Sequence, residues 1–419
     1  MPITLPFRHA MPPVRLLLAS ALAATLLPAA AHAACNDKNF SLVLNVDPGN
    51  GVETGRRCED TAENFFDLLN DAAFQQMVPS YTDMAFAQAN IDFNGVPITL
   101  QFDFESSELL FAIPALGIHE VFAGTTRDAS ADMLVEYLKK SGVMSQIMRY
   151  QAAHSPHSAI AGPGGLIPSA AAADFDAAMS DTMREITGGS GPDSPTFSIG
   201  ASYGSMTVDG RKGELTTVPF SRVWRSDSTP GQMFTLSGSV TMVKMAGAEA
   251  YHGGLGAAFR LPLSERWALT PSLRYAVTGS ADLASVAGMY SVGLSSTYHI
   301  PLDGLDLVIG NMAGYYKTTK LSIGDYSFDP KIKTWSLRNG VMLAQPVNLM
   351  GLPLSVEYSL VDTRYTGGTE FFVDNTQEIG VSIGTNRSGD VSKSFARFGL
   401  RYLHGRDTNS ITLSGSYWF

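Results

Sequence analysis

Residues 409–419 read NSITLSGSYWF and decide how the rest of the sequence is interpreted. Side chains alternate between the two faces of a β-strand, so every second residue shares a face. One face of this segment is mainly apolar: Ile411, Leu413, Gly415, Tyr417 and Phe419. The other face carries the hydroxyl side chains Ser410, Thr412, Ser414 and Ser416. The segment is therefore predicted to be a strand with one apolar and one polar face.

The same alternation recurs through the C-terminal half, for example in Arg266–Val277, Tyr290–Ile300 and Leu352–Leu360. Strands of about ten residues with an apolar lipid face and a polar lumen face are typical of membrane-spanning β-barrels. We therefore predict a transmembrane antiparallel β-barrel of about twelve strands over residues 195–419. Its strands are expected to begin near Thr196, Glu214, Gln232, Glu249, Arg266, Gly288, Leu305, Thr334, Leu352, Phe371, Ser392 and Asn409.

Several charged residues fall on the polar face of these strands and are expected to line the lumen. They are Arg260, Arg274, Arg338, Glu357, Glu378, Arg397 and Arg401. As a pore lining they would favour anions, and as a structural network they would pair with one another or with whatever fills the barrel. Aromatic residues near the strand ends are expected in the two membrane girdles. These are Trp224, Trp267, Tyr298, Tyr315, Trp335, Tyr365 and Tyr417.

The overall composition narrows the function classes. The chain has 419 residues, of which 45% are hydrophobic and only 16% are charged, with a formal net charge of −10. The sequence pI is about 5.3 and no basic stripe is present to neutralise phosphates, so nucleic acid is not expected as a partner.

The first 33 residues have the layout of a secretory signal peptide, with Arg8 and Arg15 before an apolar run and small residues at its end. Cleavage is expected between Ala33 and Ala34. Export would place Cys35 and Cys58 in an oxidising compartment, which favours a disulfide between them. A lipidated Cys35 is the alternative, although His32 stands where a lipobox would have Leu.

Residues 34–153 predict a small α+β domain. Strands are expected over 39–46 and 109–122, and helices over 61–77 and 130–140. Asn94-Gly95 between two apolar runs predicts a β-hairpin. A linker rich in Ala, Gly and Pro follows over 154–173, and 174–188 is expected to form a helix that plugs the barrel.

The ending Tyr417-Trp418-Phe419 resembles the C-terminal assembly signal of bacterial outer-membrane β-barrels. A helix followed by about twelve strands and this ending resembles the translocator unit of the autotransporter family. Two departures stand beside that resemblance: the segment before the helix is short and shows no repeat, and the Asn-Asn pair at which some family members are cleaved is absent.

The resemblance implies a protein of the Gram-negative outer membrane that translocates or displays its own N-terminal domain. A passive or substrate-selective pore with a periplasmic N-terminal domain is the first alternative, and an outer-membrane hydrolase with an unrecognised site is the second. We expect no enzyme: no G-x-S-x-G elbow occurs, and no barrel histidine has a serine two residues away on the same strand face. We expect no cofactor and no metal, because His154 and His157 lie in the linker without Cys or carboxylate neighbours.

The expected partners follow from the predicted barrel. Outer-membrane lipid and lipopolysaccharide would surround it, while the barrel-assembly machinery and periplasmic chaperones would bind it transiently. The sequence leaves the oligomeric state open, as it does the side of the membrane that holds residues 34–153.

Overall fold

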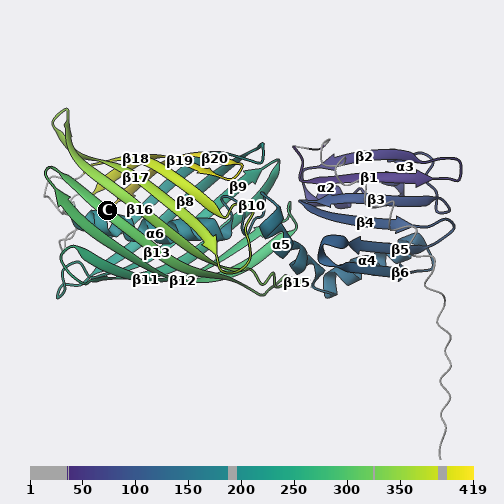
Figure 1. Cartoon of the computed structure of the whole chain (residues 1–419), viewed down its shortest axis with the longest axis horizontal. Helices are drawn as coiled ribbons and strands as arrows, with labels where there is room; N and C mark the ends of the chain where they lie inside the picture. Colours follow the sequence, from purple (N-terminus) through teal and green to yellow (C-terminus); the bar gives the residue numbers. More distant parts are fainter. Residues whose placement is uncertain (1–34, 36, 187–195, 324–325, 386–393) are drawn as a thin grey trace, which may run out of the picture.

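The computed structural model describes residue 35 and residues 37–186, 196–323, 326–385 and 394–419. Two β-sheet regions lie end to end along the long axis of the molecule, a barrel and a smaller N-terminal domain (Figure 1). One helix, α6, runs inside the barrel.

The predicted barrel is confirmed. Twelve antiparallel strands form a closed ring, and β20 completes it by pairing with β7 from Thr408↔Val208 to Trp418↔Ser198. The strands are β7 (Phe197–Val208), β8 (Arg211–Arg225), β9 (Met233–Met245), β10 (Ala248–Pro262), β11 (Trp267–Ser280), β12 (Ser285–Leu302), β13 (Leu305–Thr319), β16 (Lys333–Leu349), β17 (Leu352–Thr366), β18 (Asn375–Thr385), β19 (Phe395–Gly405) and β20 (Thr408–Trp418). A short hairpin, β14 (Leu321–Ile323) with β15 (Tyr326–Phe328), extends the connection between β13 and β16.

The strands place their apolar residues outward and their polar residues inward. Leu255 and Leu273 are 58% and 61% exposed on the outer wall, whereas Arg274 between them in the ladder is 3% exposed and faces the lumen. This inside-out arrangement suits a hydrocarbon solvent outside the barrel. Among the described residues no helix is long and apolar enough to cross a membrane.

The two ends of the barrel differ in what they carry. The first strand begins at Phe197 and the last one ends beside Phe419, and their backbones are hydrogen bonded to each other. We call this end the C-terminal rim. The opposite end, which we call the domain-side rim, adjoins the N-terminal domain. Two-residue turns with positive φ angles at both positions occur at both rims, as Asp209-Gly210 and Ala246-Gly247 at the domain-side rim and Met350-Gly351 at the C-terminal rim. Such turns match the twist of antiparallel strands.

The N-terminal domain contains a six-stranded antiparallel sheet in the order β2-β1-β3-β4-β5-β6. Its strands are β1 (Phe40–Asp47), β2 (Glu53–Glu59), β3 (Phe86–Phe93), β4 (Val96–Phe102), β5 (Glu108–Ile113) and β6 (Ile118–Ala123). Its helices are α2 (Ala62–Phe66), α3 (Asp71–Met77), α4 (Arg127–Lys140) and α5 (Val143–His154), with a 3-10 turn, η2 (Pro114–Leu116). Asn94 and Gly95 form the β3–β4 turn with φ angles of 49° and 87°.

Four local expectations in this domain differ from the structure. The strand expected over 109–122 is the hairpin of β5 and β6, because the 3-10 turn η2 reverses the chain between them. The single helix expected over 61–77 is two helices, because Asn70 leaves the helical conformation and its side chain accepts from the Ala73 N–H as an N-cap. Strand β2 was not anticipated, since ETGRRCE is polar and pairs only with β1 at the sheet edge. Helix α5 lies in a stretch for which no element was expected.

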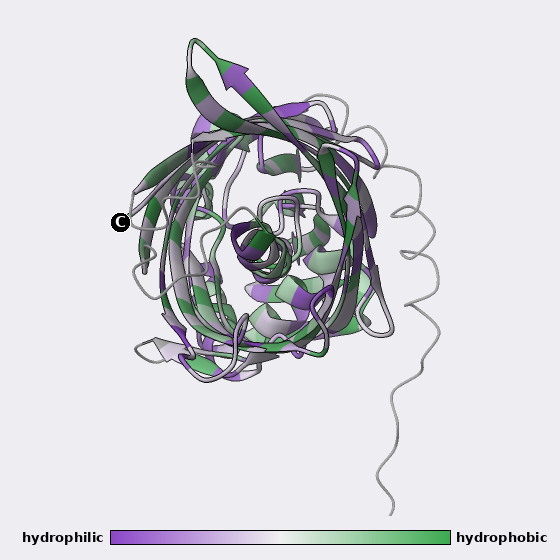
Figure 2. Cartoon of the chain, turned by 90° about the vertical axis from the view of Figure 1, so that its left-hand side faces the viewer, coloured by the Kyte–Doolittle hydropathy of each residue, from purple (hydrophilic) through white to green (hydrophobic). Residues whose placement is uncertain are grey.

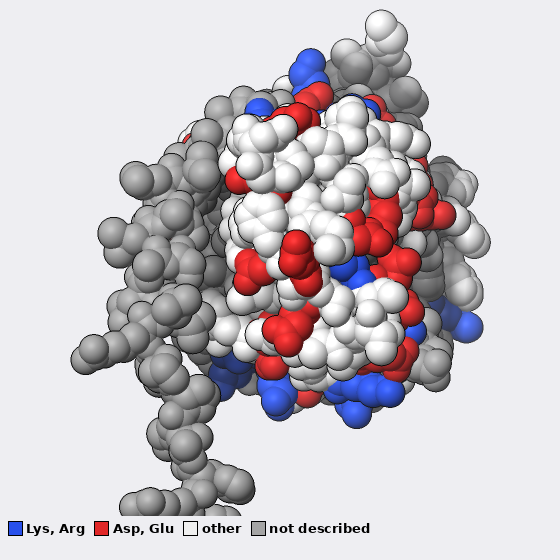
Figure 3. Space-filling view, turned by 90° about the vertical axis from the view of Figure 1, so that its right-hand side faces the viewer, with Lys and Arg blue, Asp and Glu red and all other residues white. Residues whose placement is uncertain are grey.

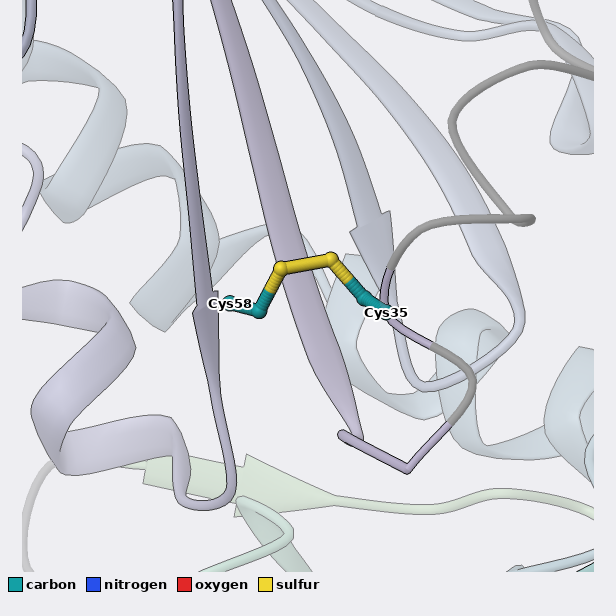
Figure 4. The surroundings of a disulfide bond; sticks show 2 residues. All are labelled: Cys35 and Cys58. Atoms are coloured by element: carbon teal, nitrogen blue, oxygen red, sulfur yellow. A yellow bond between two sulfur atoms is a disulfide. The ribbon is translucent and has the colours of Figure 1, made fainter.

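Cys35 and Cys58 form a disulfide with their Cα atoms 6.0 Å apart (Figure 4). Cys58 lies on β2 and pairs with Ser41 on β1, so the bridge fastens the start of the described chain to the edge of the sheet. The face of the domain that points away from the barrel displays scattered Asp and Glu side chains, with Lys and Arg mostly along one margin (Figure 3).

Helix α6 (Leu166–Ile186) begins eight residues before the expected position. Residues 166–173 of the predicted linker are therefore helical, because Pro168 is tolerated in a first turn and the four alanines 170–173 favour helix. One expected girdle residue, Tyr365, instead packs inward against Phe371, with ring centroids 5.1 Å apart.

Candidate functional site

The candidate site is the barrel lumen together with α6, which occupies it. Viewed along the barrel, the helix lies near the centre of the ring (Figure 2). Its N-terminal end is at the domain-side rim, where His252 Nε2 on β10 lies 2.8 Å from the Gly164 carbonyl oxygen and donates to it. Its last residues lie at the C-terminal rim, where the Arg184 guanidinium stacks 4.0 Å from the centroid of the Trp418 ring.

The first contact between helix and wall is a buried ion pair. Asp174 Oδ1 accepts from Arg274 Nε on β11 at 2.8 Å, and both side chains are about 5% exposed or less. Tyr316 on β13 donates to the other carboxylate oxygen of Asp174 at 3.4 Å. Buried charges are tolerated when they are paired and hydrogen bonded in this way, and removing one partner is costly.

A second network lies on another side of the helix. Arg401 on β19 bonds Asp176 of α6 at 2.8 Å and Glu378 of β18 at 3.1 Å. Glu378 also accepts from Arg338 of β16 at 2.7 Å, and the Arg338 guanidinium lies 5.3 Å from the centroid of the Phe175 ring on α6. One network of charged side chains therefore connects α6, β16, β18 and β19.

The remaining helix contacts are closer to the C-terminal rim. Asp181 bonds Arg184 on its own helix and accepts from Thr235 of β9 at 3.0 Å. Thr182 and Thr297 of β12 are hydrogen bonded at 2.8 Å. The helix is thus held by polar contacts to strands on several sides of the barrel, which fixes both its depth and its rotation.

Apolar packing complements these bonds. Phe175 and Met179 on α6 are 2% and 3% exposed and lie against the wall at Gly310 of β13 and Gly340 of β16. A Cβ added at Gly310 would collide with Met179 Sδ, and one at Gly340 would come within 3.0 Å of Phe175 Cζ. The helix can pack this closely against the wall because Gly310 and Gly340 have no side chains.

The structure places the seven predicted lumen charges on the inner face of the wall, and it brings five of them into two groups. Arg338, Glu378 and Arg401 share the network above, and Arg397 donates to Glu357 at 2.8 Å. Arg274 instead pairs with the helix, and Arg260 donates to the Gly231 carbonyl at 2.6 Å.

Sequence reasoning missed the acidic partners on the helix, Asp174, Asp176 and Asp181. A signal for them existed, because the predicted lumen residues include five arginines and only two glutamates. Such an excess of buried positive charge requires acidic groups from whatever fills the barrel.

The junction between the two regions is also packed. The Ala62 N–H on α2 donates to the Asp282 carbonyl at 2.7 Å, and the Asn39 amide donates to the Ala246 carbonyl at 3.3 Å. Ala248, Ala250 and Leu283 of the barrel belong to the same buried apolar cluster as the core of the domain. The N-terminal domain therefore caps the domain-side rim.

His157 lies buried within this junction, at 4% exposure. Its Nδ1 is 3.2 Å from Asn39 Oδ1 and 3.0 Å from Arg211 Nη1 of β8. Burial, with the nearby Arg211 charge, lowers the pKa of His157 to about 3. The ring is thus neutral at physiological pH.

The remaining predicted site residues are the histidine of the linker, the C-terminal residues and the expected cleavage site. His154 stacks on Tyr150 with ring centroids 3.8 Å apart, and the described residues contain no group of three or more potential metal-binding side chains. Phe419 is 57% exposed and stacks on Phe197, Tyr417 faces outward, and Trp418 faces inward against Phe395. Ala33 and Ala34 lie outside the described residues.

Comparisons with known proteins give a likeness of fold only. No family model matches the chain, and no curated protein matches it. Among solved structures, the translocator domain of NalP from Neisseria meningitidis is similar with 12% identity and a TM-score of 0.42, over 60% of this chain and 97% of that one. The β domain of the Bordetella autotransporter BrkA is similar with 12% identity and a TM-score of 0.41, over 54% and 99%.

A porin, KdgM, is also similar, with 11% identity and a TM-score of 0.34, over 53% of this chain and 99% of that one. Translocator barrels, which the sequence predicted, and a porin are therefore both among the structural neighbours of this chain. Porins share this fold, so the likeness does not decide between display and a pore.

Proposed function

We propose that this chain is an outer-membrane protein of the autotransporter type, which carries its own N-terminal domain to the cell surface and holds it there. The observation that supports this proposal is the path of α6. The helix leads from the domain at one rim, through the lumen, to the opposite rim where the barrel begins and ends.

Two features suggest which rim faces outward. Extracellular loops of such barrels are generally longer than periplasmic turns, and the connection from Thr319 to Lys333, which contains the β14–β15 hairpin, lies on the domain-side rim. The C-terminal rim carries Phe419, the last residue of the expected assembly signal. Recognition of that signal by the assembly machinery would take place on the periplasmic side.

The helix argues for display and against a permanently open pore. A passive pore requires a continuous aqueous path, but α6 lies near the centre of the ring, and its Asp174 and Asp176 are paired with arginines of the wall (Figure 2). A pore function would require the helix to leave, which would expose Arg274 without its acidic partner Asp174 and leave Arg401 with Glu378 alone.

Surface labelling of intact cells tests the orientation. An epitope inserted in the exposed β1–β2 turn, between Gly49 and Gly51, is expected to bind antibody on intact cells. A matched epitope in the β12–β13 turn at Asp303-Gly304, on the C-terminal rim, is expected to bind only after the outer membrane is permeabilised. The reverse pattern would overturn the proposal and favour a periplasmic domain.

A further inference from the structure

A row of polar residues crosses the outer wall of the barrel. Ser296, Asn311, Asn339, Asp362 and Gln377 lie on five neighbouring strands, β12, β13, β16, β17 and β18, and each is the direct cross-strand partner of the next. All five lie on the outward face of their strands, and Asn311, Asn339 and Gln377 are exposed. We call this row the polar stripe.

The stripe descends from the domain-side rim into the apolar band. Asn311 and Asn339 each lie four residues from the aromatic pair Tyr315–Trp335, whose ring centroids are 5.3 Å apart. Four residues span about 13 Å of strand, or about 10 Å along the membrane normal at the usual tilt. The apolar band of such barrels is about 25 Å tall, so this asparagine pair lies near its middle.

Lipid cannot satisfy these amides. Asn311 Nδ2 donates to Asn339 Oδ1 at 2.7 Å, which uses one donor and one acceptor of a pair that offers four N–H donors and two carbonyl oxygens. Unpaired polar groups in hydrocarbon are costly. Polar residues at membrane depth generally face protein or a water-filled cavity, whereas this pair faces away from the lumen.

An apolar hollow lies directly beside the stripe, on the side toward the C-terminal rim. It has a volume of about 410 Å³. Its lining comes mainly from outward side chains of strands β13 to β19, including Leu307, Val341, Tyr358, Leu360, Ile379 and Leu400. An apolar hollow bordered by polar groups has the composition of a protein interface, with a water-free centre and hydrogen-bonding groups at its side.

We propose that this wall, from β13 to β18, is the contact surface of a homodimer in the plane of the membrane. A two-fold interface brings the same patch of both subunits together, so the patch must complement itself. Carboxamides meet that requirement because each one both donates and accepts. An acid and a base also lie together at the stripe, since Arg364, next to it on β17, has its Nε 3.1 Å from Asp362 Oδ2.

A second copy is favoured over an acyl chain because hydrocarbon would fill the hollow and leave the remaining donors and acceptors of Asn311 and Asn339 without partners. The inference concerns the outer wall alone, so it stands or falls separately from the orientation of the domain.

The oligomeric state of the full-length chain in lipid nanodiscs tests the proposal, with molar mass measured by light scattering. The wild type is expected to be dimeric. The double variant Asn311→Leu/Asn339→Leu, which makes the wall apolar, should raise the dissociation constant of the dimer about tenfold or more, because several intramembrane hydrogen bonds are lost. Thr216→Leu, an outward polar residue on β8, is the matched control and should leave the dimer unchanged.

Cross-linking in native membranes gives a second readout. Asn339→Cys is expected to form a covalent dimer on mild oxidation, and Thr216→Cys is not, while heat-dependent gel mobility verifies that each barrel is folded. A monomeric wild type, with or without bound lipid, would overturn the proposal. A dimer whose dissociation constant is unchanged in the double variant, or that cross-links through residue 216 and not through residue 339, would overturn it as well.

Discussion

The barrel and the N-terminal domain are both antiparallel sheets built on the same two-residue alternation, but they turn opposite faces to their surroundings. In β1 the apolar residues Leu42 and Leu44 are at most 1% exposed and point into the core of the domain. In β10 the apolar Leu255 is 58% exposed, and the lumen face carries Arg260 and His252. The pattern of alternation therefore specifies a sheet, whereas the solvent on each side decides which set of residues is buried.

The interiors differ accordingly. The core of the domain is an apolar cluster around Phe40, Phe65 and Phe93, whose rings contact one another. The barrel interior is a mixture of apolar packing and ion pairs between the wall and α6. A core of the second kind depends on each charge keeping its partner, which gives a direct way to test the comparison.

The largest effect is expected from removing one charge of the buried pair between helix and wall. Arg274→Met leaves the Asp174 carboxylate without its guanidinium and should destabilise the folded barrel by about 3 to 5 kcal/mol. Urea unfolding in detergent micelles, followed by tryptophan fluorescence, measures the loss. The double variant Arg274→Met/Asp174→Leu should recover most of it, and a single variant as stable as the wild type would contradict an ion-dependent interior.

The second-largest effect is expected on the outer wall of the barrel, which is compared with the surface of the N-terminal domain at two residues of equal exposure. Leu255 on β10 and Val121 on β6 are 58% and 59% exposed. Leu255→Arg places a charge in the apolar band and should cost about 2 to 4 kcal/mol in lipid vesicles. Val121→Arg, in water, should change stability by no more than about 0.5 kcal/mol. Equal costs at both positions would mean that the barrel wall does not face lipid.

The smallest effect, at most about 1.4 kcal/mol for the first pH unit below 6.5, concerns the junction that joins the two regions. The pKa of His157 is lowered to about 3 in the folded chain from its ordinary 6.5, so the unfolded or undocked state binds more protons as the pH falls below about 6.5. Stability from the neutral ring is therefore complete above that pH. It should decline by about 1.4 kcal/mol per pH unit between 6.5 and 3.

Limited proteolysis of the junction across this pH range provides the measurement. His157→Gln should flatten the profile, whereas His119→Gln, at an exposed position on β6, should leave it as in the wild type. An unchanged profile in His157→Gln would assign the pH dependence to other groups.

The sequence predicted the barrel well because each strand carries its own evidence. Alternation and turn residues are local, so the predicted start of the strand at Leu352 coincides with that of β17, and most others agree within a few residues. The pairing of Asp174 with Arg274 is not local. It depends on the depth and rotation of a helix relative to a wall one hundred residues away in sequence.

The remaining differences have similar causes. Residues 166–173 have no charged side chains and predict a linker. In the structure they are helical, because packing against the barrel wall stabilises a conformation that the isolated segment would not hold. Strand β2 lacks the apolar alternation that would identify it, because it is an edge strand with one neighbour. In both places tertiary contacts decide a conformation that local preference leaves undecided.

The width of the lumen constrains the order of events during biogenesis. A helix is about 10 to 12 Å across with its side chains, and one helix already occupies the centre of the ring and contacts strands on several sides (Figure 2). A sheet of six strands is about 24 Å wide, so the finished domain is too broad to travel the same route. If the domain is displayed at the cell surface, two orders of events are compatible with this width. The disulfide and the six-stranded sheet form after the N-terminal segment has crossed the membrane, or the β20–β7 pairing that closes the barrel forms last, around a chain that is already being translocated.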